Sequence, residues 1–320
     1  MPEVSVCITC YNHESYIGQC LDSVLQQQGD FSLQILIGDD GSIDRTRNII
    51  CDYAQRYPDQ VNAILQPVRL GASANLQSLI ERATGDLIAH LDGDDYWLPG
   101  KLAAQLEALN QSPTAIAAYC NAQVINAEGD LVGFFNDHVP ARFGLDYLTK
   151  CGNFLNTSSA LYRSSARQPI LDIDQDFIDY RTNIVLAARG DIIFVSEPLV
   201  VYRWMVQNSL TSSGREPIYR RYLDAIEEAA RLGASTQAID RCVRRYCRSL
   251  WYSALWPPRP GRLASFFGQL LKAPRLNQSR LKLLLWSLHA LLELPKVGWR
   301  HFEGARTGRK VFFPTGHHRD

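Results

Sequence analysis

The chain is most informative at Leu87-Ile88-Ala89-His90-Leu91-Asp92-Gly93-Asp94-Asp95-Tyr96-Trp97. An apolar run ends here in three carboxylates within four residues, and anions this close repel one another unless a cation lies between them. Divalent cations such as Mg²⁺ take oxygen ligands and usually keep positions open for substrate phosphates. Open α/β sheets bind ligands at the carboxyl ends of their strands. The stretch therefore indicates a metal-dependent site for a phosphorylated substrate, with a solvated acidic turn as the alternative.

The first 120 residues alternate between strand and helix patterns. Strands are expected at residues 4–8, 33–37, 61–65, 87–91 and 116–122, with helical patterns between them. Pro99 suits the first turn of a helix that runs to about Asn110. Strands separated by helices indicate parallel βαβ units. The expected fold class is therefore α/β, a mostly parallel sheet with helices on both faces.

The second part of the chain has a different character. Strands are expected at residues 158–162, 192–195 and 199–202, a helix at 176–188, and mainly helices from Glu216, with breaks at 257–261 and Pro274. Residues 1–213 hold 13 Lys and Arg against 25 Asp and Glu, whereas residues 214–320 hold 20 against 8. We therefore expect an α/β domain over 1–213 and a basic helical region over 214–320. The basic region suggests an anionic partner: nucleic acid, an anionic membrane surface or the acidic domain itself.

Two helical faces in the basic region help to indicate which partner it binds. One apolar face is formed by Leu281, Leu284, Leu285, Leu288, Leu291 and Leu292. This segment is too short and too polar to span a bilayer, so it either lies in a membrane interface or packs on the domain. A second face carries Arg241, Arg244, Arg245 and Arg248. Because no nucleic-acid-binding fold is recognisable, we expect no nucleic-acid partner.

The eight cysteines are scattered along the chain. The start, Met1-Pro2-Glu3, lacks the basic and apolar pattern of a signal peptide, so we expect reduced thiols and a cytoplasmic protein. Cys7 and Cys10 form a C-x-x-C. Cys7 lies inside an expected strand, which favours a packed side chain over redox or zinc chemistry.

Polar segments follow each of the first four expected strands. They are residues 9–14, 38–42, 70–75 and the Asp92 cluster, and the carboxyl ends of parallel strands meet at one edge of a sheet. Asp39 can accept hydrogen bonds from a base or ribose, Tyr11 offers a ring for stacking, and Gly71 permits close backbone approach. The chain has no G-x-G-x-x-G after the first strand, no G-x-x-x-x-G-K-[ST] and no G-x-S-x-G. These absences argue against a dinucleotide fold, a P-loop NTPase and an α/β-hydrolase.

The chain resembles the family 2 glycosyltransferases with the GT-A fold. The resemblance is carried by Val4 to Asn12, Gly38 to Thr46, Gly71 to Asn75, Asp92 to Trp97 and Pro99 to Leu102, and more weakly by residues 153–163 and 197–203. It implies a nucleotide-sugar donor, usually a UDP-sugar, and Mg²⁺ or Mn²⁺ as cofactor. By this resemblance Thr9, Tyr11 and Asp39 hold the nucleoside. Glu14 and Asn75 lie in or beside the matching segments and are further candidates for donor binding.

The resemblance also assigns the carboxylates. Asp92 and Asp94 occupy the DxD positions as metal ligands, and Asp95 lies beside them. By the resemblance, this cluster contacts both the ribose and the metal-bound diphosphate. The metal offsets the negative charge that develops on the leaving diphosphate. Family members need a general base that takes the proton of the acceptor hydroxyl. In the family this base is the Asp of a Glu-Asp pair, about eleven residues before a Gly. Counting back from Gly190 places Asp179 there, and Asp176 competes.

Three positions depart from the family pattern. Ile178 stands at the Glu position, Met205 where many relatives have a His, and Ala74 where an Arg is common. A solvated helix residue is the alternative interpretation of Asp179.

The resulting prediction is a metal-dependent, inverting sugar transfer to a glycan or lipid-linked acceptor, as in cell-surface polysaccharide synthesis. The basic helices would hold the enzyme peripherally on the inner face of the plasma membrane. A non-catalytic nucleotide-sugar-binding module and a sugar-phosphate nucleotidyltransferase stay open as alternatives. The nucleotidyltransferase normally needs a Gly-rich first loop, which residues 9–14 lack.

Overall fold

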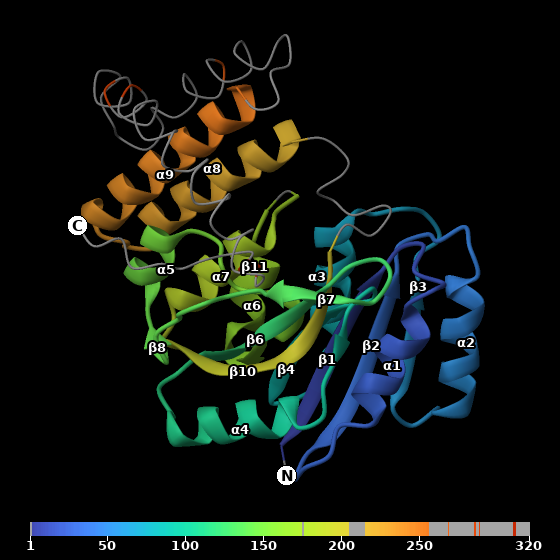
Figure 1. The fold of residues 1–320 in the computed structure, drawn as a ribbon. Coiled ribbons are helices and arrows are strands. Elements are labelled where there is room, and N and C mark those ends of the chain that lie inside the picture. Colours follow the sequence, from blue (N-terminus) through green and yellow to red (C-terminus); the bar gives the residue numbers. More distant parts are fainter. Residues whose placement is uncertain are drawn as a thin grey trace.

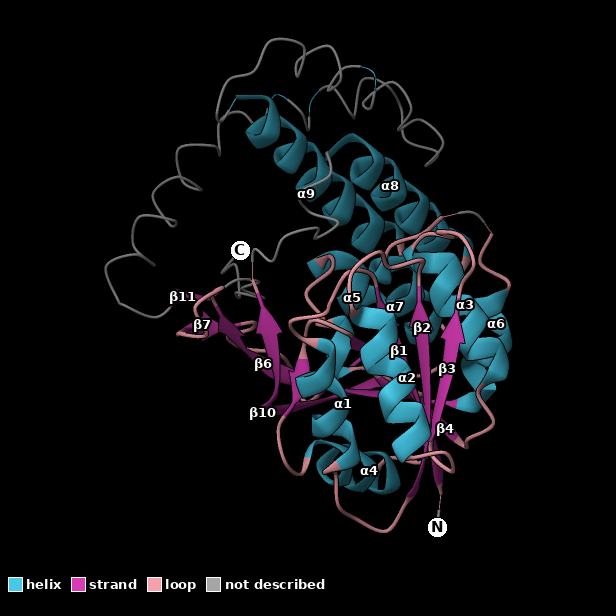
Figure 2. Cartoon of the chain, turned by 90° about the vertical axis from the view of Figure 1, so that its right-hand side faces the viewer, coloured by secondary structure: helices cyan, strands magenta, loops and turns pink. Residues whose placement is uncertain are grey.

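The protein is described here from a computed structural model, which describes residues 2–174, 176–204 and 215–255, with residues 268, 285, 288 and 310–311. Its centre is one mixed sheet with the strand order β11-β7-β6-β9-β4-β1-β2-β3. Helices cover both faces of the sheet, as Figures 1 and 2 show from two sides. The predicted α/β class is confirmed.

The amino-terminal half of the sheet is parallel, as expected from the alternating pattern. Strands β1 (Glu3–Cys10), β2 (Ser32–Asp39), β3 (Val61–Leu65) and β4 (Leu87–Asp92) lie in the order β4-β1-β2-β3. In this register Thr9 is the partner of both Gly38 and Asp92. The polar segments after these strands therefore share one edge of the sheet.

The other half departs from the simple βαβ expectation. Strand β6 (Ala117–Ile125) does not pair with β4, because the short β9 (Leu161–Arg163) lies between them, antiparallel to both. Residues 158–162 were expected to form one strand, but residues 157–159 form the 3₁₀ turn η1 (Thr157–Ser159) instead. Pro99 also precedes its helix, since Gly100 is the N-cap of α4 (Lys101–Gln111).

A single long strand, β10 (Ile192–Arg203), replaces the two short strands expected at 192–195 and 199–202. It pairs with β6 in parallel through two register shifts that flank Pro198. Proline has no N–H to donate to a ladder, so a bulge is where a strand tolerates it. The sheet is completed by β5 (Tyr96–Trp97), β7 (Leu131–Phe134), β8 (Arg142–Phe143) and β11 (Lys310–Val311).

Two apolar clusters, one on each face of the sheet, form the core. One contains α1 (Ile17–Leu25), α2 (Thr46–Arg56) and α4, and the other α3 (Ala72–Arg82), α5 (Leu145–Cys151), α6 (Arg167–Leu171) and α7 (Asp179–Ala187). Strand side chains alternate between faces, so Cys7 enters one cluster and Cys10 the other. Both thiols are buried, and burial raises the pKa of each. They do not form a redox or zinc pair.

Two further helices lie outside the second layer. Helices α8 (Arg215–Arg231) and α9 (Thr236–Leu255) contact α5 and α7 and bury side chains such as Ile226, Cys242 and Val243 (Figure 1). The expected breaks at 257–261 and Pro274 lie outside the described residues. So does most of the leucine-rich segment, of which Leu285 and Leu288 are described and exposed. Among the described helices, none has the length and apolar character needed to cross a bilayer.

Candidate active site

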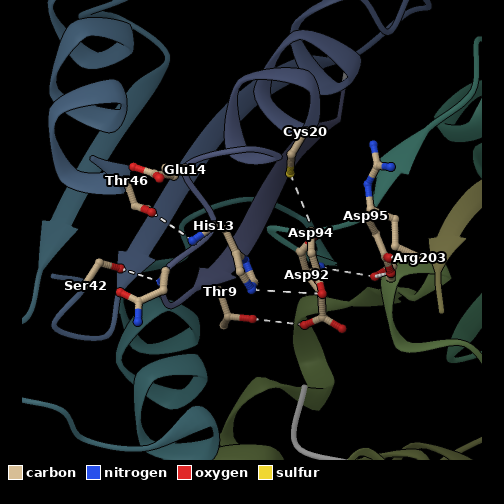
Figure 3. A network of polar contacts seen from close by, with 12 residues as sticks. Thr9, His13, Glu14, Cys20, Ser42, Thr46, Asp92, Asp94, Asp95 and Arg203 are labelled. Carbon is tan, nitrogen blue, oxygen red and sulfur yellow. Dashed lines mark hydrogen bonds and ion pairs between the residues drawn. The ribbon is translucent and has the colours of Figure 1, made fainter. Parts of the chain in front are cut away.

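The carboxyl end of β4 carries the first carboxylate of the cluster, Asp92. Its Oδ1 accepts a hydrogen bond from Thr9 Oγ1 (3.1 Å; Figure 3). The same atom lies 3.3 Å from His90 Nε2. The side chain of Asp92 is 42% exposed. Burial alone would raise the pKa of Asp92, but the hydrogen bonds from His90 and Thr9 outweigh it, and the net direction is downward. Asp92 is therefore an anion that opens toward solvent.

The carboxylate of Asp94 is held much more loosely. The Nε2 atom of His13 lies 4.0 Å from its Oδ2, too far for a hydrogen bond. Burial raises the pKa of Asp94; His13 opposes this shift and the neighbouring Asp92 adds to it. In the described part of the chain the Asp94 carboxylate has no side-chain hydrogen-bond partner. A carboxylate that is mostly buried and so poorly satisfied is suited to a cation.

Asp95 belongs to the same cluster but faces inward. It is 2% exposed, Oδ2 accepts from Ser158 Oγ (2.6 Å), and Oδ1 accepts from the Arg203 backbone N–H (3.0 Å). Burial raises the pKa of Asp95 well above its usual range, and the charges of Asp94 and Asp92 raise it further. The structure thus brings Asp95 into the cluster but gives both of its oxygens to protein groups.

At the end of β2, Asp39 is fully buried. Its Oδ2 accepts from Arg47 Nε (2.6 Å) and from the Ser42 backbone N–H (3.1 Å), while Oδ1 has no partner in the structure. A buried acceptor without a partner is costly unless a ligand supplies the donor. The predicted stacking ring of Tyr11 lies nearby on the β1–α1 loop and is covered by the guanidinium of Arg69, 4.0 Å from its centroid.

The two remaining predicted donor-binding residues take part in loop structure. Glu14 is exposed, and its Oε2 accepts from the Arg45 backbone N–H (2.9 Å). Asn75 is 1% exposed and donates from Nδ2 to the Gly38 carbonyl (2.8 Å). Both therefore tie the segments around the β2 terminus together.

Two residues that build the site, Ser158 and Asp40, had no role predicted from the sequence. Ser158 donates to Asp95 and accepts from the Asp92 backbone N–H (3.1 Å), so it fixes the acidic turn from the other half of the chain. Asp40 accepts from the backbone N–H groups of Leu70 (2.6 Å) and Gly71 (3.0 Å) and holds the loop before α3. The adjacent pair Asp39-Asp40 was a signal for the second residue, whereas no local pattern marks Ser158.

Asp179 is the first residue of α7, whereas the helix was expected to begin at residue 176. Its Oδ1 accepts from Asn153 Nδ2 (2.9 Å) and its Oδ2 from Thr157 Oγ1 (2.8 Å). Burial raises the pKa of Asp179 in spite of these bonds, and the charge of Asp92 also raises it. Burial raises the pKa of Tyr202 on β10 as well, with further contributions from the carboxylates of Asp95, Asp94, Asp92 and Asp179. Asp179 and the acidic cluster therefore share one electrostatic environment.

The competing candidate, Asp176, is occupied elsewhere. Its Oδ1 accepts from Ser73 Oγ (2.7 Å), and its Oδ2 is paired with Arg221. These contacts connect α3, the segment before α7, and α8. The departure at Met205 lies outside the described residues, so its contacts are not described.

A separate cavity of about 700 Å³ lies between α6, α7 and α8, and it contains none of the predicted site residues. Its central charges are paired with one another: Arg181 with Asp174 (2.9 Å) and Glu228 (3.3 Å), and Arg231 with Glu228. This cavity joins the helical layers and is distinct from the acidic edge.

Known proteins resemble this chain in sequence. Residues 5–164 match the family described as Glycosyl transferase family 2. The chain is 32% identical over 202 residues to an uncharacterized protein of Mycobacterium tuberculosis, an alignment that covers 62% of this chain and 58% of that protein. It therefore spans less than two thirds of that relative. A Campylobacter jejuni enzyme named GalNAc(5)-diNAcBac-PP-undecaprenol beta-1,3-glucosyltransferase is 23% identical over 80% of this chain and 82% of its own.

Solved structures share the fold. Staphylococcus aureus TarS 1–349 in complex with UDP-GlcNAc superposes with a TM-score of 0.69 at 14% identity, over 96% of this chain and 92% of that one. A mannosyltransferase of Pyrobaculum calidifontis in complex with GDP-Man and Mn²⁺ gives a TM-score of 0.57 at 18% identity, over 96% and 85%. The predicted GT-A fold is confirmed. Because the family match spans half of its length, the chain belongs to glycosyl transferase family 2.

Proposed function

We propose that this protein is a metal-dependent, inverting glycosyltransferase that moves a sugar from a nucleotide sugar to a glycan or lipid-linked acceptor. The observation that carries the proposal is that Thr157 donates to Asp179 while the adjacent Ser158 donates to Asp95 and accepts from the Asp92 backbone N–H, so the 3₁₀ turn η1 connects Asp179 with the acidic turn. These carboxylates come from distant parts of the chain, yet Asp92 contributes to the raised pKa of Asp179. The carboxylates of the Asp92–Asp94 turn would hold the metal that binds the leaving diphosphate, and the Asp179 carboxylate would accept the proton of the attacking hydroxyl.

The nucleoside would bind at the ends of β1 and β2. The unpartnered Oδ1 of Asp39 accepts an N–H, which the base edges of uracil and guanine both offer. The base would stack on the face of the Tyr11 ring opposite the Arg69 guanidinium, and Thr9, Glu14 and Asn75 complete the predicted set around it. The TarS complex with UDP-GlcNAc favours UDP, and the GDP-Man complex makes GDP the alternative to test.

The metal, Mg²⁺ or Mn²⁺, would be held by Asp94 and Asp92. Both oxygens of Asp94 and Oδ2 of Asp92 are without side-chain donors among the described residues, which suits a hard cation. The described residues contain no group of three His, Cys, Asp or Glu side chains that would hold a metal alone. Such a cation commonly takes its other ligands from substrate phosphates and water. When bound, it supplies Lewis-acid stabilisation of the charge on the leaving diphosphate.

Asp179 would act as the general base. The acceptor oxygen forms a bond to the anomeric carbon, the bond from that carbon to the donor phosphate oxygen breaks, and its electron pair leaves with the nucleoside diphosphate. The proton of the acceptor hydroxyl passes to the Asp179 carboxylate. Asn153 and Thr157 hold the two oxygens of Asp179 in one orientation and still leave lone pairs for that proton.

The acceptor end of the proposal includes an anionic membrane surface. The name of the Campylobacter jejuni relative includes a glycan linked to undecaprenol, and undecaprenol is a lipid alcohol. Helix α9 carries Arg241, Arg244 and Arg248 on its outer side, with Arg244 exposed. Basic side chains attract anionic headgroups by about 1 kcal/mol each near the surface. We therefore propose peripheral attachment through α9 at the cytoplasmic leaflet.

Calorimetric titration with UDP and GDP, each with and without Mn²⁺, tests the donor site. Metal-dependent binding of one nucleotide is expected, and Asp94→Ala should remove the metal-dependent part. Vesicles containing phosphatidylserine, compared with neutral vesicles and duplex DNA, test the surface proposal. Failure of both nucleotides to bind would contradict the transferase assignment and favour a degenerate member of the family.

A further inference from the structure

The β1–α1 loop holds a side chain that none of the assigned roles uses, His13. Its backbone N–H donates to Thr46 Oγ1 (2.8 Å), and its carbonyl accepts from the backbone N–H groups of Tyr16 and Ile17 (both 2.9 Å). The preceding Asn12 has φ 56°, the only positive φ of a non-glycine residue in the described ranges. Asn12 is held there by its N–H to Ser42 Oγ (2.8 Å) and by Ile43, whose N–H donates to its Oδ1 (2.9 Å).

This strained loop directs the imidazole of His13 over the acidic turn. A Cβ at Gly93 would lie 3.0 Å from His13 Nδ1 and 2.8 Å from Cys10 Cβ, so the turn can pass this closely because Gly93 lacks a side chain. The Nε2 atom then faces Asp94 across 4.0 Å (Figure 3). A left-handed backbone at a non-glycine residue costs free energy and persists where surrounding contacts impose it. Here the contacts around Asn12 fix the position of the His13 side chain.

The ring nitrogens of His13 have different surroundings. Nδ1 is buried and has no hydrogen-bond partner, whereas Nε2 points into the space beside Asp94. Because no acceptor lies at Nδ1, the proton of a neutral ring is better placed on Nε2. A nearby cation, Arg203, pairs with Gln19 and has its guanidinium over the rings of Tyr16 (4.9 Å) and Tyr96 (5.3 Å), although its Nε has no hydrogen-bond partner.

We infer that His13 is a donor-contacting residue whose Nε2–H binds an oxygen of the nucleoside diphosphate beside Asp94. The inference rests on the proposed function, since it requires a diphosphate at the Asp92–Asp94 turn. The distance of 4.0 Å to Asp94 is too long for a direct hydrogen bond, and both side chains are partly exposed to solvent. A hydrogen bond to this anion adds affinity for the phosphates and none for the nucleoside.

The test is calorimetric titration of the full chain with uridine and with UDP in the presence of Mn²⁺. If the wild type binds GDP rather than UDP, GDP replaces UDP and guanosine replaces uridine throughout. His13→Asn places its amide at the Nδ1 position and should weaken diphosphate binding by about tenfold to a hundredfold, the usual loss for a hydrogen bond to a charged group. Uridine affinity should not change. His13→Gln carries an N–H close to the Nε2 position and should retain most of the diphosphate affinity.

The outcomes separate this inference from the proposed function. If the wild type binds a diphosphate and His13→Asn binds it equally well, the role of His13 is refuted while the donor site stands. Equal losses for His13→Asn and His13→Gln, or a parallel loss of uridine binding, would show a merely structural role. If the wild type binds neither diphosphate, the proposed function fails and this inference fails with it. Thermal unfolding of both variants verifies that they fold.

Discussion

Lys101, the first residue of α4, is fully buried. Its Nζ has no hydrogen-bond partner and lies 3.8 Å from the centroid of the Trp97 ring. Burial lowers its pKa from 10.5 to about 7, with a small opposing effect from Cys120. Lys101→Met keeps the length of the side chain and removes the ammonium group. We expect this substitution to stabilise the protein.

The magnitude follows from linkage. A pKa near 7 in the folded state against 10.5 in the unfolded state corresponds to roughly 5 kcal/mol of destabilisation at pH values below 7. The face of the Trp97 ring attracts the ammonium and offsets up to about 2 kcal/mol of this cost. The net gain from Lys101→Met should therefore be about 3 kcal/mol at pH 6.5.

The sign of the pH dependence is fixed by the same values. Between the lowered pKa of Lys101 in the folded state and 10.5, the unfolded chain binds the proton and the folded chain does not, so the stability of the wild type rises with pH. The advantage of Lys101→Met is complete below pH 7 and disappears as pH approaches 10.5. Urea unfolding at pH 6.5, 8 and 9.5 measures this difference, and Lys150→Met, at an exposed position, is the control. A variant that is less stable than the wild type at pH 6.5, or a gain that does not shrink with pH, would refute the reasoning.

Four further predictions concern the site. Asp179→Asn should lower turnover by about 10²- to 10⁴-fold with nearly unchanged donor affinity, and initial rates with varied donor concentration test this. In the wild type, turnover should fall as pH drops through the raised pKa of Asp179, because the general base must be ionised. A pH–rate profile whose acid side falls at the pKa of an ordinary carboxyl group would contradict this. Asp95→Ala should lower the free energy of unfolding in urea by about 2 kcal/mol, because it leaves the Ser158 hydroxyl and the Arg203 N–H without their acceptor. Asp94→Ala should lower it little, and an equal loss for both variants would contradict this prediction. Gly38→Ala places a Cβ 2.5 Å from Asn75 Oδ1 and should cost about 1–3 kcal/mol, with Gly18→Ala, where the nearest atom is 3.8 Å away, as the tolerant control in the same assay.

The sequence predicted the parallel half of the sheet well, because each strand and helix there is marked by its own hydrophobic period. The strands β1 to β4 and the helices α1 to α3 fall where the pattern indicated. The pattern failed where pairing is decided by distant residues. Nothing in residues 161–163 indicates that β9 lies between β4 and β6, and the two apolar runs on either side of Pro198 conceal one bulged strand.

For the site, the sequence by itself determined that Thr9, Asp39 and Asp92 meet at one edge, since the ends of adjacent parallel strands must do so. Only the tertiary structure decided what each carboxylate does there. Asp94 and Asp95 are neighbours in sequence, yet Asp95 is satisfied by Ser158 and Arg203, residues 63 and 108 positions away, and Asp94 is not. The role of His13 also depends on the loops that hold it over Gly93. Hydrophobic periodicity records which face of an element is buried, whereas the partners of a buried polar atom come from segments that meet only in the folded chain.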